Sequence, residues 1–345
     1  MSGQPERCYA VEELKSLQSS IADLTQSMVI QRARVEKYKD TDLAAARDAF
    51  SMLQATRRNL VRAINSARLP LMETEEYQTA NVYPLPKQPT PQNTEAERQP
   101  VSLEERHAAY STMLSYLTLL DKHWENLLER GLSEDRIQRN EYRSMPETEQ
   151  GRRLLASLLR SCGFDLLGVP GFRTYYGDWT LSGPNGFLIP VRDKNGLIQG
   201  LKIRLDDTDD PGRKYRWLSS RDMTNGTRSY SWVHVTGDTA SKRAYLTEGP
   251  LKGDVASFLA HDALFVCIGG VNALNGLTDT LRSLNVTEVV EAMDMDQNTK
   301  PEVRKAIQAM RREVQAVKRW KYTKYTWDPA YKGVDDYLLS RVAAM

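Results

Sequence analysis

Residues 241–345 are predicted to form an α/β domain with a parallel sheet, because strand-like and helix-like segments alternate along this part of the chain. Residues 244–247 are short, apolar and β-prone, and residues 264–268 are continuously apolar. Residues 288–296 begin as an apolar strand and end in two aspartates, and a helix-length segment separates each strand from the next. Strands connected in this way pair in parallel through right-handed crossovers. Ligands of such sheets bind beyond the carboxyl ends of the strands.

The first 70 residues are predicted to form an α-helical coiled-coil hairpin. Apolar residues recur at alternating three- and four-residue steps in residues 14–38 and again in residues 43–67, with capping residues in the polar segment between them. Such a hairpin either packs on itself or recruits a partner, and the sequence leaves both open. Five prolines among polar residues mark residues 71–100 as a linker.

Residues 101–240 are predicted to form a separate α+β unit. Ser102 and Glu105 have the spacing of a capping box and begin a helix that is expected to continue to a stop at Gly131. Further along, two strand patterns flank a turn of Asp, Asn and Gly residues at 193–196. This order of elements favours helices packed against an antiparallel sheet.

Three carboxylates follow the predicted strands of the C-terminal domain. Glu248 ends the first strand, and Asp294 and Asp296, two apart in a strand, are expected to point to the same face. Mg²⁺ (or Mn²⁺) takes oxygen ligands and often binds through one or two carboxylates plus substrate phosphates. Glu248 would add a third carboxylate, either as a ligand or as a proton-transfer group. The sequence therefore predicts a divalent cation site at this edge of the sheet.

The segment Glu248-Gly-Pro-Leu-Lys-Gly-Asp254, followed by Asp294-Met-Asp296, resembles the toprim domain of primases, topoisomerases and some nucleases. The resemblance implies catalytic and metal-binding roles for Glu248, Asp294 and Asp296. It also implies a fourth carboxylate at a late acidic position, which Asp335 matches. Lys252, one helical turn after Glu248, either contacts a phosphate or is solvated.

Upstream, Arg130-Gly-Leu-Ser133 and the hairpin that begins at Gly186 resemble the catalytic core of bacterial primases. Residues 142–146 (Tyr-Arg-Ser-Met-Pro) match a stretch that follows a similar segment in toprim proteins of bacterial mobile elements. In the primase family a basic face holds template and nucleotide, and Tyr215 or Trp217 would stack a base. Without the resemblance, a sheet edge rich in Lys and Arg is explained by solubility. The candidate phosphate contacts are Arg192, Lys202, Arg204, Lys214, Arg216 and Lys252.

The overall composition excludes several classes of protein. A net charge of +2 gives no global basic signal, and 40% hydrophobic with 27% charged residues is typical of a globular protein. The three cysteines form no C-x-x-C pair, so neither a zinc finger nor a disulfide framework is expected. No Walker A pattern, signal peptide or membrane-length apolar run is present, which predicts a cytoplasmic protein without a membrane partner.

The combined prediction is a toprim domain with a parallel sheet flanked by helices, preceded by an α+β primase-like subdomain and the coiled-coil hairpin. The predicted function is that of a DNA primase-like, Mg²⁺-dependent nucleotidyltransferase that acts on single-stranded DNA and nucleotides in mobile-element replication. One alternative is a toprim nuclease in defence or repair. Another is a non-catalytic adaptor whose hairpin recruits a helicase or polymerase, and the hairpin also allows homo-oligomers.

Overall fold

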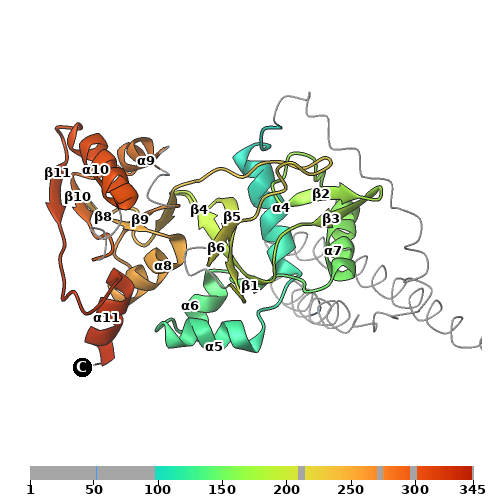
Figure 1. Ribbon diagram of the computed structural model, residues 1–345, viewed down its shortest axis with the longest axis horizontal. Coiled ribbons are helices and arrows are strands. Elements are labelled where there is room, and N and C mark those ends of the chain that lie inside the picture. Colours follow the sequence, from blue (N-terminus) through green and yellow to red (C-terminus); the bar gives the residue numbers. More distant parts are fainter. Residues whose placement is uncertain are drawn as a thin grey trace, which may run out of the picture.

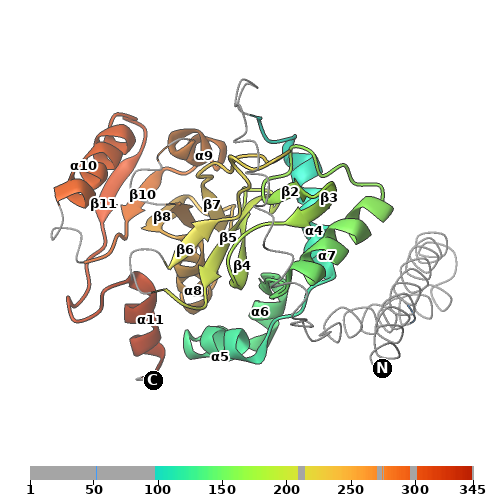
Figure 2. The same ribbon diagram turned by 45° about the vertical axis from the view of Figure 1, so that its right-hand side comes forward.

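The structure, a computed structural model, describes residue 52 and residues 98–208, 214–269, 274, 276–295 and 301–343. In the described part of the chain, a four-stranded and a five-stranded sheet lie next to each other, each with its own helices, and a third sheet has two strands (Figures 1 and 2). Apart from residue 52, the predicted hairpin lies outside these residues, as do nearly all of the linker and Asp296. None of the described helices is long and apolar enough to cross a membrane.

The first unit is built on a four-stranded antiparallel sheet with the strand order β1-β4-β5-β6. Its apolar core lies between one face of this sheet and two helices, α4 and α7, while the β2–β3 hairpin packs on α7. The helices are α4 (Leu103–Ser115), α5 (Asp121–Glu129), α6 (Glu134–Arg139) and α7 (Glu149–Ser161). The strands are β1 (Arg143–Ser144), β2 (Phe172–Tyr175), β3 (Asp178–Leu181), β4 (Gly186–Arg192), β5 (Ile198–Leu205) and β6 (Tyr215–Trp217).

The helix predicted to run from Ser102 to Gly131 is in fact two helices. The capping box is confirmed, since the Ser102 hydroxyl accepts from the Glu105 N–H at 3.2 Å and the Glu105 carboxylate accepts from the Ser102 N–H at 3.0 Å. The prediction of one continuous helix is wrong, because α4 ends at Ser115. The chain then runs alongside β1, where the Thr118 carbonyl accepts from the Ser144 N–H at 2.8 Å. Tertiary hydrogen bonds therefore outweigh the helical pattern at this point.

The second unit is a five-stranded sheet with the order β11-β10-β8-β9-β7. Strands β8 to β11 pair in parallel, as the alternation of strands and helices predicts, and β7 is an antiparallel edge strand. Helices α9 and α10 cover one face and α8 and α11 the other (Figure 1). The strands are β7 (His234–Thr236), β8 (Arg243–Glu248), β9 (Phe265–Ile268), β10 (Glu288–Glu291) and β11 (Lys321–Lys324). The helices are α8 (Pro250–Leu259), α9 (Leu277–Ser283), α10 (Pro301–Gln315) and α11 (Val334–Ala343).

Helix α8 joins the two units. Its apolar residues pack in one buried cluster with Phe187 and Ile189 of β4. Its Asp254 carboxylate is buried, and it accepts from the Tyr142 hydroxyl at 2.7 Å and lies 3.0 Å from His234 Nε2. Burial alone would raise the pKa of Asp254, but His234 and Tyr142 outweigh that effect and lower it. A buried carboxylate that is satisfied from both units fixes the position of α8.

Candidate active site

The turn from β8 into α8 forms one wall of the candidate active site. Glu248 is the last residue of β8 and lies at the carboxyl edge of the parallel sheet, half-buried. Gly249 follows with φ 87°, a backbone conformation that favours glycine, and this allows α8 to begin at the next residue. The Gly249 N–H still donates to the Ile268 carbonyl of β9 at 2.9 Å, so the sheet extends up to the turn. The predicted position of Glu248 at a strand end is confirmed.

Asp294 follows β10, the strand that pairs with β8, and lies beyond the end of that strand. β10 ends at Glu291, so the prediction of one strand continuing to Asp296 is wrong. The reason is a change of hydrogen-bond partner, because the Met295 N–H donates to the Lys332 carbonyl at 2.9 Å, outside the sheet. The Asp294 carboxylate instead forms an ion pair with the Lys252 ammonium of α8. The argument that alternate strand residues share a face therefore does not apply to Asp294.

Asp335 reaches the same place from the C-terminal helix. It lies in the first turn of α11 and is only 5% exposed. Its Oδ1 atom has no hydrogen-bond partner among the residues that the structure describes, while Oδ2 lies 3.7 Å from the Arg130 guanidinium. A Cβ atom added at Gly333 would be 2.3 Å from Asp335 Oδ1 and 3.4 Å from Lys252 Nζ. Asp335 and Lys252 therefore face each other across a glycine that leaves room for both.

The pKa shifts of these groups record a shared electrostatic field. Burial raises the pKa of Glu248. The nearby Asp294 carboxylate adds to this increase, and the Lys252 ammonium opposes it. Burial also raises the pKa of Asp335, again opposed by Lys252. Burial would lower the pKa of Lys252, but Asp294, Asp335 and Glu248 outweigh it and raise the pKa. Three carboxylates, from β8, from the segment after β10 and from α11, thus act on one ammonium.

The donor set fits a hard divalent cation in its chemistry. Carboxylate oxygens are the ligands that Mg²⁺ and Mn²⁺ take, and the unpartnered Oδ1 atom of Asp335 is buried beside Lys252. However, no group of three or more His, Cys, Asp or Glu side chains within the described ranges is arranged to hold a metal ion. Asp296, the remaining predicted ligand, lies outside those ranges. The cage of four carboxylates therefore stays a prediction.

The predicted basic residues do not share one surface. By strand register, Lys202 lies opposite Trp217 and Arg204 opposite Tyr215, so these four side chains share one face of the first sheet. Arg216 lies opposite Ile203, which faces the other side of the sheet. Alternation along β6 places Lys214 on the side of Arg216 as well, and both residues are exposed.

Lys202 is the buried member of the basic set. It is 7% exposed, and its ammonium donates to the Gly269 carbonyl at 2.7 Å and lies 5.2 Å from the centre of the Trp217 ring. Burial lowers the pKa of Lys202 to about 8, although the nearby Glu248 carboxylate acts in the opposite direction. Gly269 immediately follows β9, so Lys202 connects the basic face to the carboxyl edge of the second sheet.

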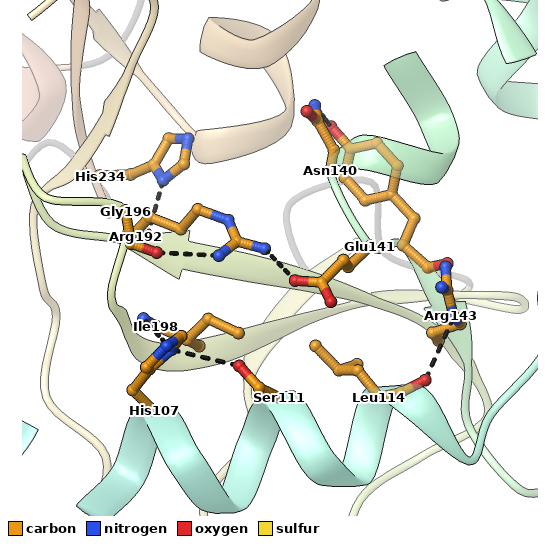
Figure 3. Close-up of polar contacts among 11 residues, drawn as sticks. His107, Ser111, Leu114, Asn140, Glu141, Arg143, Arg192, Gly196, Ile198 and His234 are labelled. Atoms are coloured by element: carbon orange, nitrogen blue, oxygen red, sulfur yellow. Dashed lines mark hydrogen bonds and ion pairs between the residues drawn. The ribbon is translucent and has the colours of Figure 1, made fainter. Parts of the chain in front are cut away.

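Arg192 is committed to contacts within the fold (Figure 3). Its guanidinium donates to the Glu141 carboxylate at 2.5 Å and to the Gly196 carbonyl at 2.9 Å, while its backbone N–H donates to His234 Nδ1 at 2.9 Å. These contacts close the β4–β5 turn against the second unit and leave the side chain 20% exposed. A phosphate contact for Arg192 stays a prediction, and it would have to replace the Glu141 ion pair.

Sequence reasoning missed the role of Lys252 within the site. The sequence predicts either phosphate contact or solvation for Lys252, whereas the structure pairs it with Asp294. A signal was present, because a lysine in the first turn of a helix opposes the helix macrodipole. That turn of α8 contains no acidic residue to compensate it. A lysine at this position therefore indicates carboxylates from elsewhere in the fold.

Comparison with known families and with curated proteins says little about this site. A sequence model of an uncharacterised methyltransferase family (DUF6094) matches residues 2–85, which precede every residue of the site. The sequence has no match among curated proteins.

The fold, in contrast, is similar to several solved bacterial primase domains. The RNA polymerase domain of Mycobacterium tuberculosis primase DnaG, bound to a double-stranded DNA oligomer with a 6-nucleotide overhang, has 16% identity and a TM-score of 0.52, over 70% of this chain and 80% of that one. A second structure of the same domain has 19% identity and a TM-score of 0.50, over 70% of this chain and 84% of that one. The zinc-binding and RNA polymerase domains of Aquifex aeolicus primase have 15% identity and a TM-score of 0.51, over 70% of this chain but only 59% of that one. The chain therefore has a mixed α/β fold similar to the catalytic core of bacterial primases.

Proposed function

We propose that the protein is a primase-like nucleotidyltransferase of the toprim class, which acts with a divalent cation on single-stranded DNA and nucleotides. The observation that supports this most is the convergence of Glu248, Asp294 and Asp335 at the carboxyl edge of a parallel sheet. The similarity in fold to primase domains supports the same class. The role in mobile-element replication rests on the sequence resemblance alone.

In this proposal each carboxylate has a stated task. Asp294 and Asp335, together with the predicted ligand Asp296, would hold the cation. When bound, the cation supplies charge neutralisation for nucleotide phosphates during in-line transfer. Glu248 has a raised pKa and sits at the strand end, so it would either complete the ligand set or move a proton at its carboxylate.

The face of the first sheet that carries Lys202 and Arg204 is the proposed approach for nucleic acid. Tyr215 is 38% exposed on this face, and Lys202 Nζ lies 5.9 Å from its ring centre. An exposed aromatic ring beside cations suits the stacking of an unpaired base together with phosphate contact. Lys214 and Arg216 would contact phosphates only from the opposite side of the same edge strand.

The test is incubation of the full chain with single-stranded DNA, the four ribonucleotides and Mg²⁺ or Mn²⁺, followed by a denaturing gel. Short new strands are the expected product. Asp294→Asn should abolish them, because it removes a carboxylate charge from the site. Asp279→Asn is the matched control, since that aspartate is 83% exposed on α9 and should leave synthesis unchanged.

The same gel distinguishes the alternatives. A shortened DNA strand without new products would favour a toprim nuclease, in which the same carboxylates activate water. Wild-type protein that neither extends nor cleaves, with either metal, would refute the enzymatic proposal. The adaptor function and the recruitment of a helicase or polymerase depend on residues 1–70 and stay predictions.

A further inference from the structure

The position of Lys252 in α8 is unfavourable unless its charge is used. It is the third residue of α8, and the helix dipole places positive potential at that end. The side chain is 20% exposed, so much of it is withdrawn from water. Solvation by water therefore does not explain why the Lys252 ammonium lies at this position.

The Lys252 ammonium interacts with the carboxylates of the candidate site. Its ammonium forms an ion pair with Asp294, and it interacts electrostatically with Asp335 and Glu248. Its Cε and Nζ atoms lie 3.2 and 3.4 Å from where a side chain at Gly333 would begin. One ammonium therefore offsets part of the negative charge of three carboxylates, which come from β8, from the segment after β10 and from α11.

Like charges at close range repel strongly in a partly buried site. Without a compensating cation, these carboxylates would disfavour the close approach of β8, the segment after β10 and α11. The lysine supplies that compensation from within the chain, at the position where a divalent cation would draw on the same oxygens.

We propose that Lys252 is an internal counter-ion of the carboxylate cluster and that its ammonium competes with the divalent cation for the Asp294 and Asp335 oxygens. This inference rests on the proposed metal-dependent function and describes how the same site is regulated. The cluster stays assembled without metal, and metal binding requires the Lys252–Asp294 ion pair to open. The cost of opening that pair weakens the affinity of the site for metal.

The test is Mn²⁺ binding to the full chain, measured from the loss of the free-ion electron paramagnetic resonance signal. Lys252→Met should tighten Mn²⁺ binding at least tenfold, because the competitor is removed. Lys252→Gln keeps a hydrogen-bond donor without the charge, and it should also tighten Mn²⁺ binding. This variant replaces Lys252→Met in the test if the Met variant folds poorly. Lys252→Arg keeps the charge and should bind Mn²⁺ within about threefold of wild type. Lys242→Met, at the amino end of β8, is the control for a general change in net charge and should match wild type.

Thermal unfolding provides a second readout of the same competition. Without metal, Lys252→Met should melt below wild type, because the carboxylates lose their counter-ion. Saturating Mn²⁺ should raise the melting temperature of this variant more than that of wild type, since binding stabilises the folded state by mass action.

The outcomes separate this inference from the proposed function. If Asp294→Asn weakens Mn²⁺ binding but Lys252→Met and Lys252→Gln bind it no tighter than wild type, the counter-ion role is overturned and the metal site stands. If wild type and Asp294→Asn titrate identically, the metal site itself is wrong and both ideas fall.

Discussion

Replacement of Lys202 by methionine should remove a pH dependence that the fold builds into its own stability. Burial lowers the pKa of Lys202 from 10.5 to about 8. Charging this residue therefore costs the folded protein roughly 3 kcal/mol more than it costs the unfolded chain, at about 1.4 kcal/mol per pH unit. The unfolded chain binds the additional proton between pH 8 and 10.5, so stability rises with pH across this window.

The measurement is the free energy of unfolding in urea, for wild type and Lys202→Met, at pH 7.5 and 9.5. Other groups titrate alike in both proteins, so their effects cancel in the difference. We expect wild type to gain roughly 2 kcal/mol relative to the variant between the two pH values. At pH 7.5 the variant avoids the cost of a buried ammonium but loses the hydrogen bond to Gly269.

Lys214→Met is the matched control, because Lys214 is exposed just before β6 on the same sheet. Its unfolding free energy should follow that of wild type at both pH values. A difference between wild type and Lys202→Met that stays constant within about 0.5 kcal/mol would show that Lys202 has an ordinary pKa. The electrostatic account of the basic face would then be wrong.

Two further predictions concern packing that supports the site. Arg311→Met should cost about 3–5 kcal/mol in urea unfolding, because it leaves the buried Glu291 carboxylate without two guanidinium hydrogen bonds of 2.6 Å. Arg312 is exposed, so Arg312→Met should change the free energy of unfolding little. Equal losses of unfolding free energy in the two variants would contradict this account of the Glu291 ion pair. Phe187→Ala should cost about 3–5 kcal/mol, because the ring is fully buried where α8 meets β4, whereas the 71% exposed Tyr176→Ala should be near neutral. A Phe187→Ala loss below 1 kcal/mol would indicate that this cluster is loosely packed.

The sequence predicts strand positions best where a short apolar run is bounded by residues that end a strand. The strands at residues 244–247 and 264–268 are found within one residue of their expected bounds. The predictions fail where distant backbone groups compete, as at the end of α4, where Thr118 pairs with Ser144. The end of β10 fails for the same reason, because Met295 bonds to Lys332. Local patterns contain no information about such partners.

For the candidate site, the sequence identified acidic residues but not the cations among them. The end of the first strand can be predicted from the sequence, so the position of Glu248 at that end could be predicted as well. The pairing of Lys252 with Asp294 joins residues 42 positions apart and depends on how α8 is set against β10. Arg311 is a second example. The apolar stripe of α10 predicts an outward-facing arginine, but the Arg311 guanidinium donates to the Glu291 carboxylate of β10.

Lys202 and Lys252 show why residue type alone does not determine charge in this region. Both are largely withdrawn from water near Glu248, yet burial lowers the pKa of one and carboxylates raise the pKa of the other. The difference lies in their partners, which are a neutral carbonyl and aromatic rings for Lys202 but an ion pair for Lys252. A lysine beside neutral dipoles gives up its proton more readily, whereas a lysine among carboxylates holds it. The proton affinity of Lys202 thus depends on a contact between the two units, because Gly269 follows β9, whereas that of Lys252 is set by Asp294 within the second unit.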